Sequence, residues 1–175
     1  TLFGVDFVDN QRGWAVGFDF DNEISIVLRT TNGGSTWSPQ SINDAGLVNL
    51  FFVNATRGWA VGVDSGGNGG ILRTDNGGAS WTPQNSGVED TLLKSVFFIN
   101  TDKGWAVGEN GIILHTTNGG ETWTSQESNT IAEWLNGVYF TTPTEGWAVG
   151  APGILLRTAD GGVTWTPQNS EIDNS

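Results

Sequence analysis

Three features of this sequence predict an all-β fold built from four repeated, four-stranded units. The motif Gly-Trp-Ala-Val-Gly occurs four times, and its tryptophans are 45, 46 and 42 residues apart, at Trp14, Trp59, Trp105 and Trp147. Turn signals separate short apolar segments within each unit. No segment carries a sustained helical periodicity. A repeat of this length with a periodic aromatic motif indicates a β-propeller with four-stranded antiparallel blades.

The strands of a unit follow one another in a fixed order. An apolar segment, 5–8 in the first unit, precedes the Gly-Trp motif, and an Ile/Leu-rich segment that ends in Arg-Thr or His-Thr follows it. The fourth strand starts at a Trp with a tail such as Thr-Pro-Gln. We therefore expect a single array with blades at 1–45, 46–91, 92–133 and 134–175. Four blades closed on themselves, a larger propeller and an oligomeric propeller are all compatible with this pattern.

Tryptophan is expected to hold the blades together. In the Gly-Trp-Ala-Val-Gly strand, Trp and Val project to one face and the small residues to the other, so a neighbouring blade can approach closely. Eight of the nine tryptophans belong to this motif or to the Thr-Trp start of the fourth strand. A buried Trp removes roughly 150–250 Å² from water, so we expect these eight to pack in the core.

An eight-residue box, Thr-Thr-Asn-Gly-Gly-Ser-Thr-Trp at 30–37, recurs in every unit. Its third position is Asn32, Asn76, Asn118 and Asp160, and its last is Trp37, Trp81, Trp123 and Trp165. Asn before two glycines favours a tight turn, because its side chain hydrogen-bonds nearby backbone and tolerates a left-handed conformation. Asn cannot serve as a general acid or a charged ligand. The box is therefore interpreted as a structural hairpin.

This box resembles the Asp-box of BNR-type repeats. Its coupling to Gly-Trp-Ala-Val-Gly is similar to the photosystem II assembly and stability factor family and its exported bacterial relatives. The resemblance implies a β-propeller and a non-catalytic protein-binding role, although Asp-box propellers also include sialidases, xyloglucan hydrolases and sorting receptors. Two features depart from the family: its propellers are usually seven-bladed, and its arginine-rich client patch has no counterpart among 7 Lys+Arg and 19 Asp+Glu. A photosynthetic role is therefore not carried over.

Composition narrows the partners and the location. The formal net charge is −12, which disfavours nucleic acid and anionic membranes because both require a basic surface. No apolar run approaches the length of a membrane span. The chain has no Cys or Met and is rich in Gly. We expect no membrane insertion, and an extracellular or cell-surface location in a bacterium.

Catalysis is not expected. Sialidase-type hydrolysis needs a Tyr nucleophile among clustered arginines, and Tyr139 lies inside a first-strand segment while the arginines recur with the repeat. Hydrolysis by paired carboxylates needs only two suitable acids, and no motif singles out a pair. The leading interpretation is a protein-binding or assembly scaffold. The alternatives are a carbohydrate-active module, which binds or hydrolyses glycans, and a structural repeat that self-associates into a filament or surface layer.

Binding is expected on the variable loops. The turns between first and second strands, and between third and fourth, have constant length, whereas the other two connections vary and are acidic. Both variable connections of an up-and-down blade lie at one end, and variable loops on a rigid scaffold usually carry binding. This variable acidic face is predicted to bind a protein, with a glycan as the other candidate, through the residues Asp19, Asp21, Glu23, Asp64, Glu109 and Trp134.

One of these loops is also a candidate metal site. Asp19, Asp21 and Glu23 offer alternating oxygen ligands of the kind calcium prefers. The loop lacks the Gly and the distal Glu of a calcium-binding loop, so a solvated acidic loop is the main interpretation. No other cofactor is expected.

Replacing Asn32 with Asp tests the structural interpretation of the box. Because Asp160 occupies the same position in the fourth box, Asn32→Asp should fold normally and leave the affinity for any ligand unchanged. The comparison is an isothermal titration of wild type and variant. A large change in affinity would show that the box has a charge-dependent role.

Overall fold

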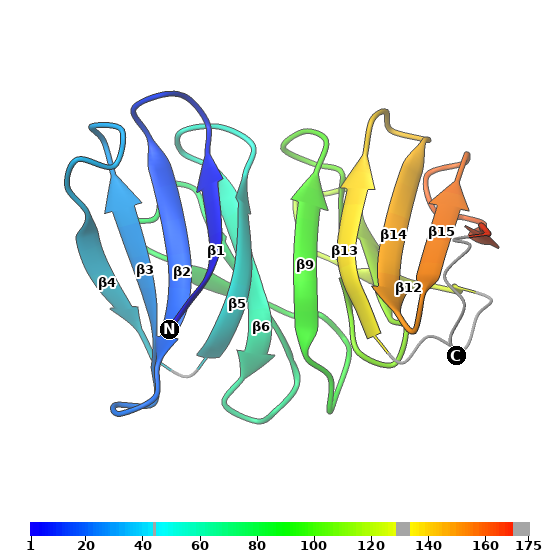
Figure 1. Cartoon of the computed structure of the whole chain (residues 1–175), viewed down its shortest axis with the longest axis horizontal. Helices are drawn as coiled ribbons and strands as arrows, with labels where there is room; N and C mark the ends of the chain where they lie inside the picture. The colour runs from blue at the N-terminus through cyan, green and yellow to red at the C-terminus, as the bar shows by residue number, and fades with distance from the viewer. Residues whose placement is uncertain (44, 129–133, 170–175) are drawn as a thin grey trace.

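The computed structural model describes residues 1–43, 45–128 and 134–169, which form four antiparallel sheets of four strands (Figure 1). Blade 1 contains β1 (Leu2–Phe7), β2 (Gly13–Asp19), β3 (Ile24–Thr30) and β4 (Ser38–Ile42). Blade 2 contains β5 (Ala45–Phe52), β6 (Gly58–Asp64), β7 (Gly69–Thr74) and β8 (Thr82–Gln84). Blade 3 contains β9 (Leu93–Phe98), β10 (Gly104–Gly108), β11 (Ile113–Thr116) and β12 (Thr124–Gln126). Blade 4 contains β13 (Trp134–Phe140), β14 (Gly146–Ala151), β15 (Ile154–Thr158) and β16 (Thr166–Pro167).

The four blades follow one another in an open arc. The innermost strands β1, β5, β9 and β13 lie side by side, each in contact with the next, and blades 1 and 4 extend to opposite sides (Figure 1). Among the described strands, no contact of comparable extent joins β1 to β13. Of the arrangements that the sequence allows, four blades closed on themselves is therefore not the one observed.

Strand boundaries differ slightly from the predicted ones. The first strand runs from Leu2 to Phe7 and not over 5–8, because Leu2 also pairs with Gly17 across a register shift in the ladder. Blade 2 begins at Ala45, one residue before the predicted limit. The predicted limits at 133 and 175 lie outside the described residues.

Consecutive blades are joined by one repeated contact. The motif tryptophan of each blade stacks on a phenylalanine of the next, with ring centroids 3.6 Å apart for Trp14–Phe52 and 3.4 Å apart for the equivalent pairs Trp59–Phe98 and Trp105–Phe140. The same three indole Nε1–H groups donate to carbonyl oxygens of the next blade's box, those of Gly77, Gly119 and Gly161, at 2.9–3.1 Å. Each tryptophan thus buries its ring and satisfies its polar atom in one interface.

The glycine before each motif tryptophan is required by the same packing. A Cβ placed on Gly58 would lie 2.5 Å from the ring of Phe52, a distance that side chains do not adopt. Phe52 therefore lies flat against its own blade's glycine and presents its other face to Trp14. Glycine in this strand, which weakens a strand elsewhere, here makes room for the aromatic layer between the blades.

Three apolar clusters, one per interface, make up the core. Five of the eight repeat tryptophans are buried: Trp14, Trp59, Trp105, Trp123 and Trp165. The expectation that all eight pack in the core fails for the rest, because Trp81 is only partly covered, and Trp37 and Trp147 lie on the terminal blades, where no neighbouring blade covers them.

Two tryptophan substitutions should separate the interface from the surface. Trp59→Ala removes a fully buried ring and should lower the free energy of unfolding by about 3–5 kcal/mol. Trp134→Ala removes a ring that is 44% exposed and contacts a lysine, a contact worth about 0.5–1 kcal/mol at exposed sites. Urea unfolding of both variants measures the difference, and equal losses would refute the role given to the stacked layer.

Candidate functional site

The two rims of the arc have different characters. The turns after the first and third strands of each blade form one rim, here the Asp-box rim, which is uppermost in Figure 1. The loops after the second strands, such as 20–23 and 65–68, lie along the opposite, variable rim (Figure 1). The structure thus places the constant turns and the variable loops at opposite ends of the strands.

Each box on the Asp-box rim is closed by its own side chains. In the first box, the Thr30 hydroxyl donates to Asn32 Oδ1 at 2.9 Å and accepts the Gly34 N–H at 2.9 Å. Asn32 Oδ1 also accepts the Thr36 N–H at 3.0 Å. Gly33 and Gly34 have φ values of 67° and 84°, which favour glycine. Asn76, Asn118 and Asp160 have matching bonds.

Asp160 makes the one charged version of this box. The hydroxyl of Thr164 donates to its Oδ2 at 2.6 Å, and the N–H of Thr164 donates to its Oδ1 at 2.9 Å. These bonds stabilise the ionised carboxylate and lower the pKa of Asp160 from 3.8 to about 2, with the Thr158 hydroxyl as a further donor. The carboxylate of Asp160 accepts hydrogen bonds from within the turn, so the fourth box has the same structural role as the other three.

Arginines on the Asp-box rim are largely neutralised by neighbouring acids. Arg57 and Arg73 both contact Asp75, at 2.7 and 3.1 Å. The other pairs are Arg12–Asp9 at 2.7 Å and Arg157–Glu145 at 2.8 Å. All Lys and Arg residues except Lys94 lie on this rim, but the four ion pairs leave it with mixed charge.

Along the variable rim, described acidic residues far outnumber cations. The acidic residues are Asp19, Asp21, Glu23, Asp64, Glu89, Asp90, Glu109 and Glu127, and the basic residue is Lys94. Two further acids expected here, Asp44 and Glu133, lie outside the described residues. The negative potential of this rim favours cationic partners, and salt screens it.

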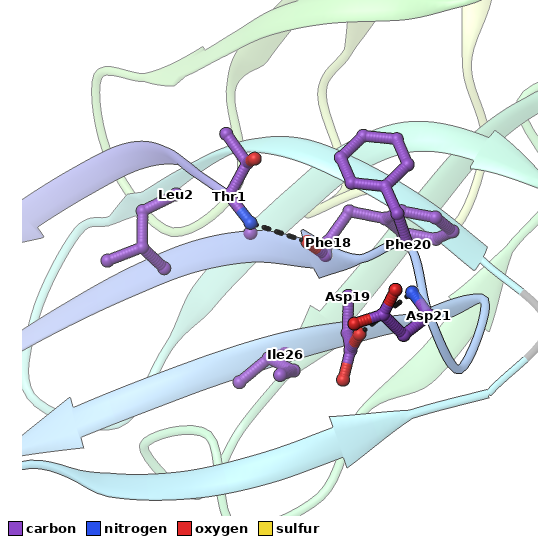
Figure 2. A pocket seen from close by; sticks show the side chains of 8 residues that line it. Thr1, Leu2, Phe18, Asp19, Phe20, Asp21 and Ile26 are labelled. Carbon is purple, nitrogen blue, oxygen red and sulfur yellow. Dashed lines mark hydrogen bonds between the residues drawn. The ribbon is translucent and has the colours of Figure 1, made fainter.

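In blade 1, Asp19 organises the loop between β2 and β3 (Figure 2). Its carboxylate accepts the Asp21 N–H at 3.0 Å and the Asn22 side-chain amide at 2.9 Å. The amide of Asn22, helped by backbone N–H groups, lowers the pKa of Asp19. The N-terminal amine of Thr1 donates to the Phe18 carbonyl at 2.7 Å beside a hollow of about 290 Å³ (Figure 2). Asp19 therefore shapes the loop, while Asp21 and Glu23 are exposed on it.

Asp64 has the same role in blade 2. Its Oδ1 accepts the N–H groups of Gly66 and Asn68 at 2.8 and 2.9 Å. The backbone bond from Asn68 is the main cause that lowers the pKa of Asp64, and the Asn68 side chain adds to it. Asp64 and Glu89 line a polar hollow of about 400 Å³ on this rim. A carboxylate held ionised in this way suits loop structure and recognition of cations.

Trp134 lies at the start of β13 and bridges blades 3 and 4. Lys94 Nζ, from β9, is 4.7 Å from the centre of the Trp134 ring and donates to Asn136 Oδ1 at 3.3 Å. Glu109 pairs with Trp134 through an isolated β-bridge, and its carboxylate accepts the Leu92 N–H at 3.3 Å. The structure thus brings Trp134 and Glu109 together, and places Asp19, Asp21, Glu23 and Asp64 on the other two blades.

Sequence reasoning missed Lys94. The signal was present, because every other Lys or Arg either precedes the Gly-Trp motif or ends a third strand, and Lys94 does neither. Its contact with Trp134 could not be read from spacing alone, since 40 residues separate them and only the packing of β9 against β13 joins them.

The calcium hypothesis stays a prediction. Within 1–43, 45–128 and 134–169, no group of three or more acidic, His or Cys side chains is arranged to hold a metal ion.

His115 stacks on Trp105 with ring centroids 5.0 Å apart, and burial, with Lys103 nearby, lowers its pKa. His115 therefore lies near the end of β11, against the Trp105 ring.

Four antiparallel four-stranded blades, each closed by an Asp-box turn, define a BNR-type β-propeller. The chain belongs to the family of the photosynthesis system II assembly factor YCF48, whose profile matches residues 43–137, more than half of its length. No match is found among curated proteins. No helix of the described residues is long and apolar enough to cross a membrane.

Solved structures agree on the fold. YCF48 bound to a D1 peptide is 18% identical, with a TM-score of 0.60, over 96% of this chain and 82% of that one. YCF48 from Cyanidioschyzon merolae is 24% identical, with a TM-score of 0.67, over 95% of this chain and 55% of that one. The GH74 enzyme of Niastella koreensis is 15% identical, with a TM-score of 0.74, over 95% of this chain and 30% of that one. This chain thus spans about half of the second protein and less than a third of the third.

Acid titration should single out the fourth box. Since the folded-state pKa of Asp160 is about 2 and its ordinary value is 3.8, the stability it contributes is present above about pH 4 and is lost as the pH falls toward 2. Asp160→Asn copies the other three boxes and removes this dependence. Urea unfolding at pH 6, 4 and 2.5 should show wild type losing its advantage over the variant as the pH falls. A constant difference would contradict the role given to the charge.

Proposed function

We propose that this chain is a non-catalytic, protein-binding assembly module that recognises its partner on the variable rim. The observation that carries the proposal is the cluster at the blade 3–blade 4 junction, where the half-exposed ring of Trp134 lies beside Lys94 and Glu109 on a rim that is otherwise acidic. An extracellular or cell-surface location belongs to the same proposal and is motivated by composition.

The chemistry of this cluster suits a basic peptide segment with one apolar side chain. Aromatic anchors that are partly exposed before binding are typical of interface hot spots. The carboxylates farther along the rim, at Asp19 and Asp64 of blades 1 and 2, are held ionised by their loop hydrogen bonds. They would attract Lys or Arg and steer their approach. The hollow beside Asp64 provides a place for a side chain along the rim.

The family gives independent support. A YCF48 protein with the same fold has been solved with a D1 peptide bound, which supports peptide recognition as the use of this scaffold. The present chain differs in charge, with four of its five arginines paired to acids on the Asp-box rim. The partner proposed here is therefore defined by its basic character.

The alternatives fit the geometry less well. Glycan stacking needs an open aromatic face, and Lys94 already covers one face of Trp134. A glycosidase needs a general acid with a raised pKa, whereas hydrogen bonds lower the pKa of both Asp19 and Asp64 on the variable rim. Burial raises the pKa of Asp6, but its carboxylate accepts the N–H groups of Phe7 and Phe52 in the contact between blades 1 and 2. The GH74 enzymes share the fold at 15–16% identity. Hydrolysis is therefore not proposed.

A pair of model peptides tests the proposal. A nonapeptide with alternating Lys and Leu should bind in isothermal titration, and the same peptide with Glu in place of Lys should not. Affinity should fall as NaCl rises, because exposed charges are screened. Trp134→Ala should weaken binding about tenfold or more, which corresponds to loss of a hot spot.

Phe20→Ala is the matched control. Phe20 is an exposed aromatic on the same rim but in blade 1, so its removal should leave the affinity near that of wild type. Equal binding of both peptides, or an unchanged affinity for the Trp134 variant, would count against this site. Tight binding of a xyloglucan oligosaccharide that depends on Trp134 would favour the glycan alternative.

A further inference from the structure

The contact that joins consecutive blades is left unmade at both ends of the arc. Each interface is formed by two different faces, and strand register shows which residues of a blade belong to each face. The Trp face of a blade presents its motif Trp and Val to the next blade, and the Phe face presents the last Phe of the first strand and a box carbonyl to the preceding blade. Blade 1 has an unpartnered Phe face, and blade 4 has an unpartnered Trp face.

On blade 1, the Phe face is apolar and open. Leu2 is 59% exposed and Phe7 42%, whereas their equivalents in blade 2, Leu47 and Phe52, are 0% and 4% exposed. Val5, equivalent to the buried Leu50, is also exposed. A groove of about 450 Å³ runs over this face, and its apolar lining includes Leu2, Val5, Leu28 and Trp37.

On blade 4, the Trp face also lacks the neighbouring blade that covers it elsewhere in the repeat. Trp147 is only partly buried, whereas Trp14, Trp59 and Trp105 are fully buried. Val149 is 46% exposed, and its equivalents, Val16, Val61 and Val107, are fully buried. Among the described contacts, none gives Trp147 Nε1 an acceptor or the Gly33 carbonyl an indole donor, although both positions are paired in every internal interface.

We propose that the Trp face of blade 4 packs on the Phe face of blade 1 of a second copy of this chain, head to tail. The contact would repeat the internal one: Trp147 stacks on Phe7, and Trp147 Nε1–H donates to the Gly33 carbonyl. The internal stacks Trp59–Phe98 and Trp105–Phe140 show that a Trp face of this repeat fits a Phe face of the same repeat.

A second copy fits because this chain carries both halves of the contact but holds them apart. Blades 1 and 4 lie at opposite ends of the arc (Figure 1), so the two faces cannot meet within one molecule. Two copies joined at both ends would form a ring of eight blades, within the usual range of four to eight. Copies joined at one end only would continue as a filament, as head-to-tail contacts do when they fail to close.

This contact is separate from the variable rim, so the two proposals can fail independently. Trp134 packs toward Lys94 of blade 3 and lies off the Trp face. Trp134→Ala should therefore leave self-association unchanged, and loss of self-association should leave the Trp134 site exposed.

Sedimentation velocity over a range of protein concentrations tests the pairing. Wild type should sediment as a species of at least twice 18.6 kDa at concentrations where Val5→Arg and Val149→Arg are each monomeric. Both residues are exposed in the single chain, so neither substitution should disturb the fold, which circular dichroism verifies. Phe7→Ser and Trp147→Ser form a second pair of variants at the centre of the contact.

Mixing the two arginine variants gives the decisive readout. The Val5 variant keeps an intact Trp face and the Val149 variant keeps an intact Phe face, so an equimolar mixture should form a heterodimer that neither forms alone. A wild-type monomer at every concentration would overturn the proposal. So would an oligomer that both arginine variants retain, or one that only one of the two abolishes.

Discussion

The stacked Trp–Phe pair between blades is the interaction on which the rest of the structure depends. A four-stranded sheet of this size has two apolar faces and cannot bury both by itself, so each blade is stable only against a neighbour. The indole ring fills the interface, its N–H satisfies a carbonyl of the next blade's box, and glycine beneath the phenylalanine makes room for the stack. The box in turn must hold that carbonyl still, which its Asn and Thr bonds accomplish.

The role of the box turns in the contact between blades explains why the two rims differ. Residues on the Asp-box rim are committed to turn geometry and to local ion pairs, and the box carbonyls accept the indole N–H groups of the preceding blade. The variable rim contributes little to that packing and is free to carry loops of different length and charge. Asp19 and Asp64 show an intermediate case, because their carboxylates build the loops and still add to the negative potential of the rim.

The same dependence makes the ends of the arc distinctive. Wherever a neighbouring blade is present, the motif tryptophan is fully buried, and where it is missing, Trp147 and Phe7 are left partly uncovered. These exposed apolar faces follow from the repeat itself, since a blade buries both of its faces only between two neighbours. Binding of a client on the rim and pairing at the ends would therefore use different surfaces of one scaffold.

The sequence by itself determined the fold class, the four units and the structural use of the box, because period, alternation and turn chemistry are local properties of the chain. The positions of Asp19, Asp21, Glu23 and Asp64 on one rim also followed from strand order. Only the tertiary structure decided that the arc stays open, that Trp37 and Trp147 are only partly buried, and that Lys94 lies on Trp134. These depend on how blades pack around a common axis, and such contacts join residues about 40 positions apart that no local pattern records.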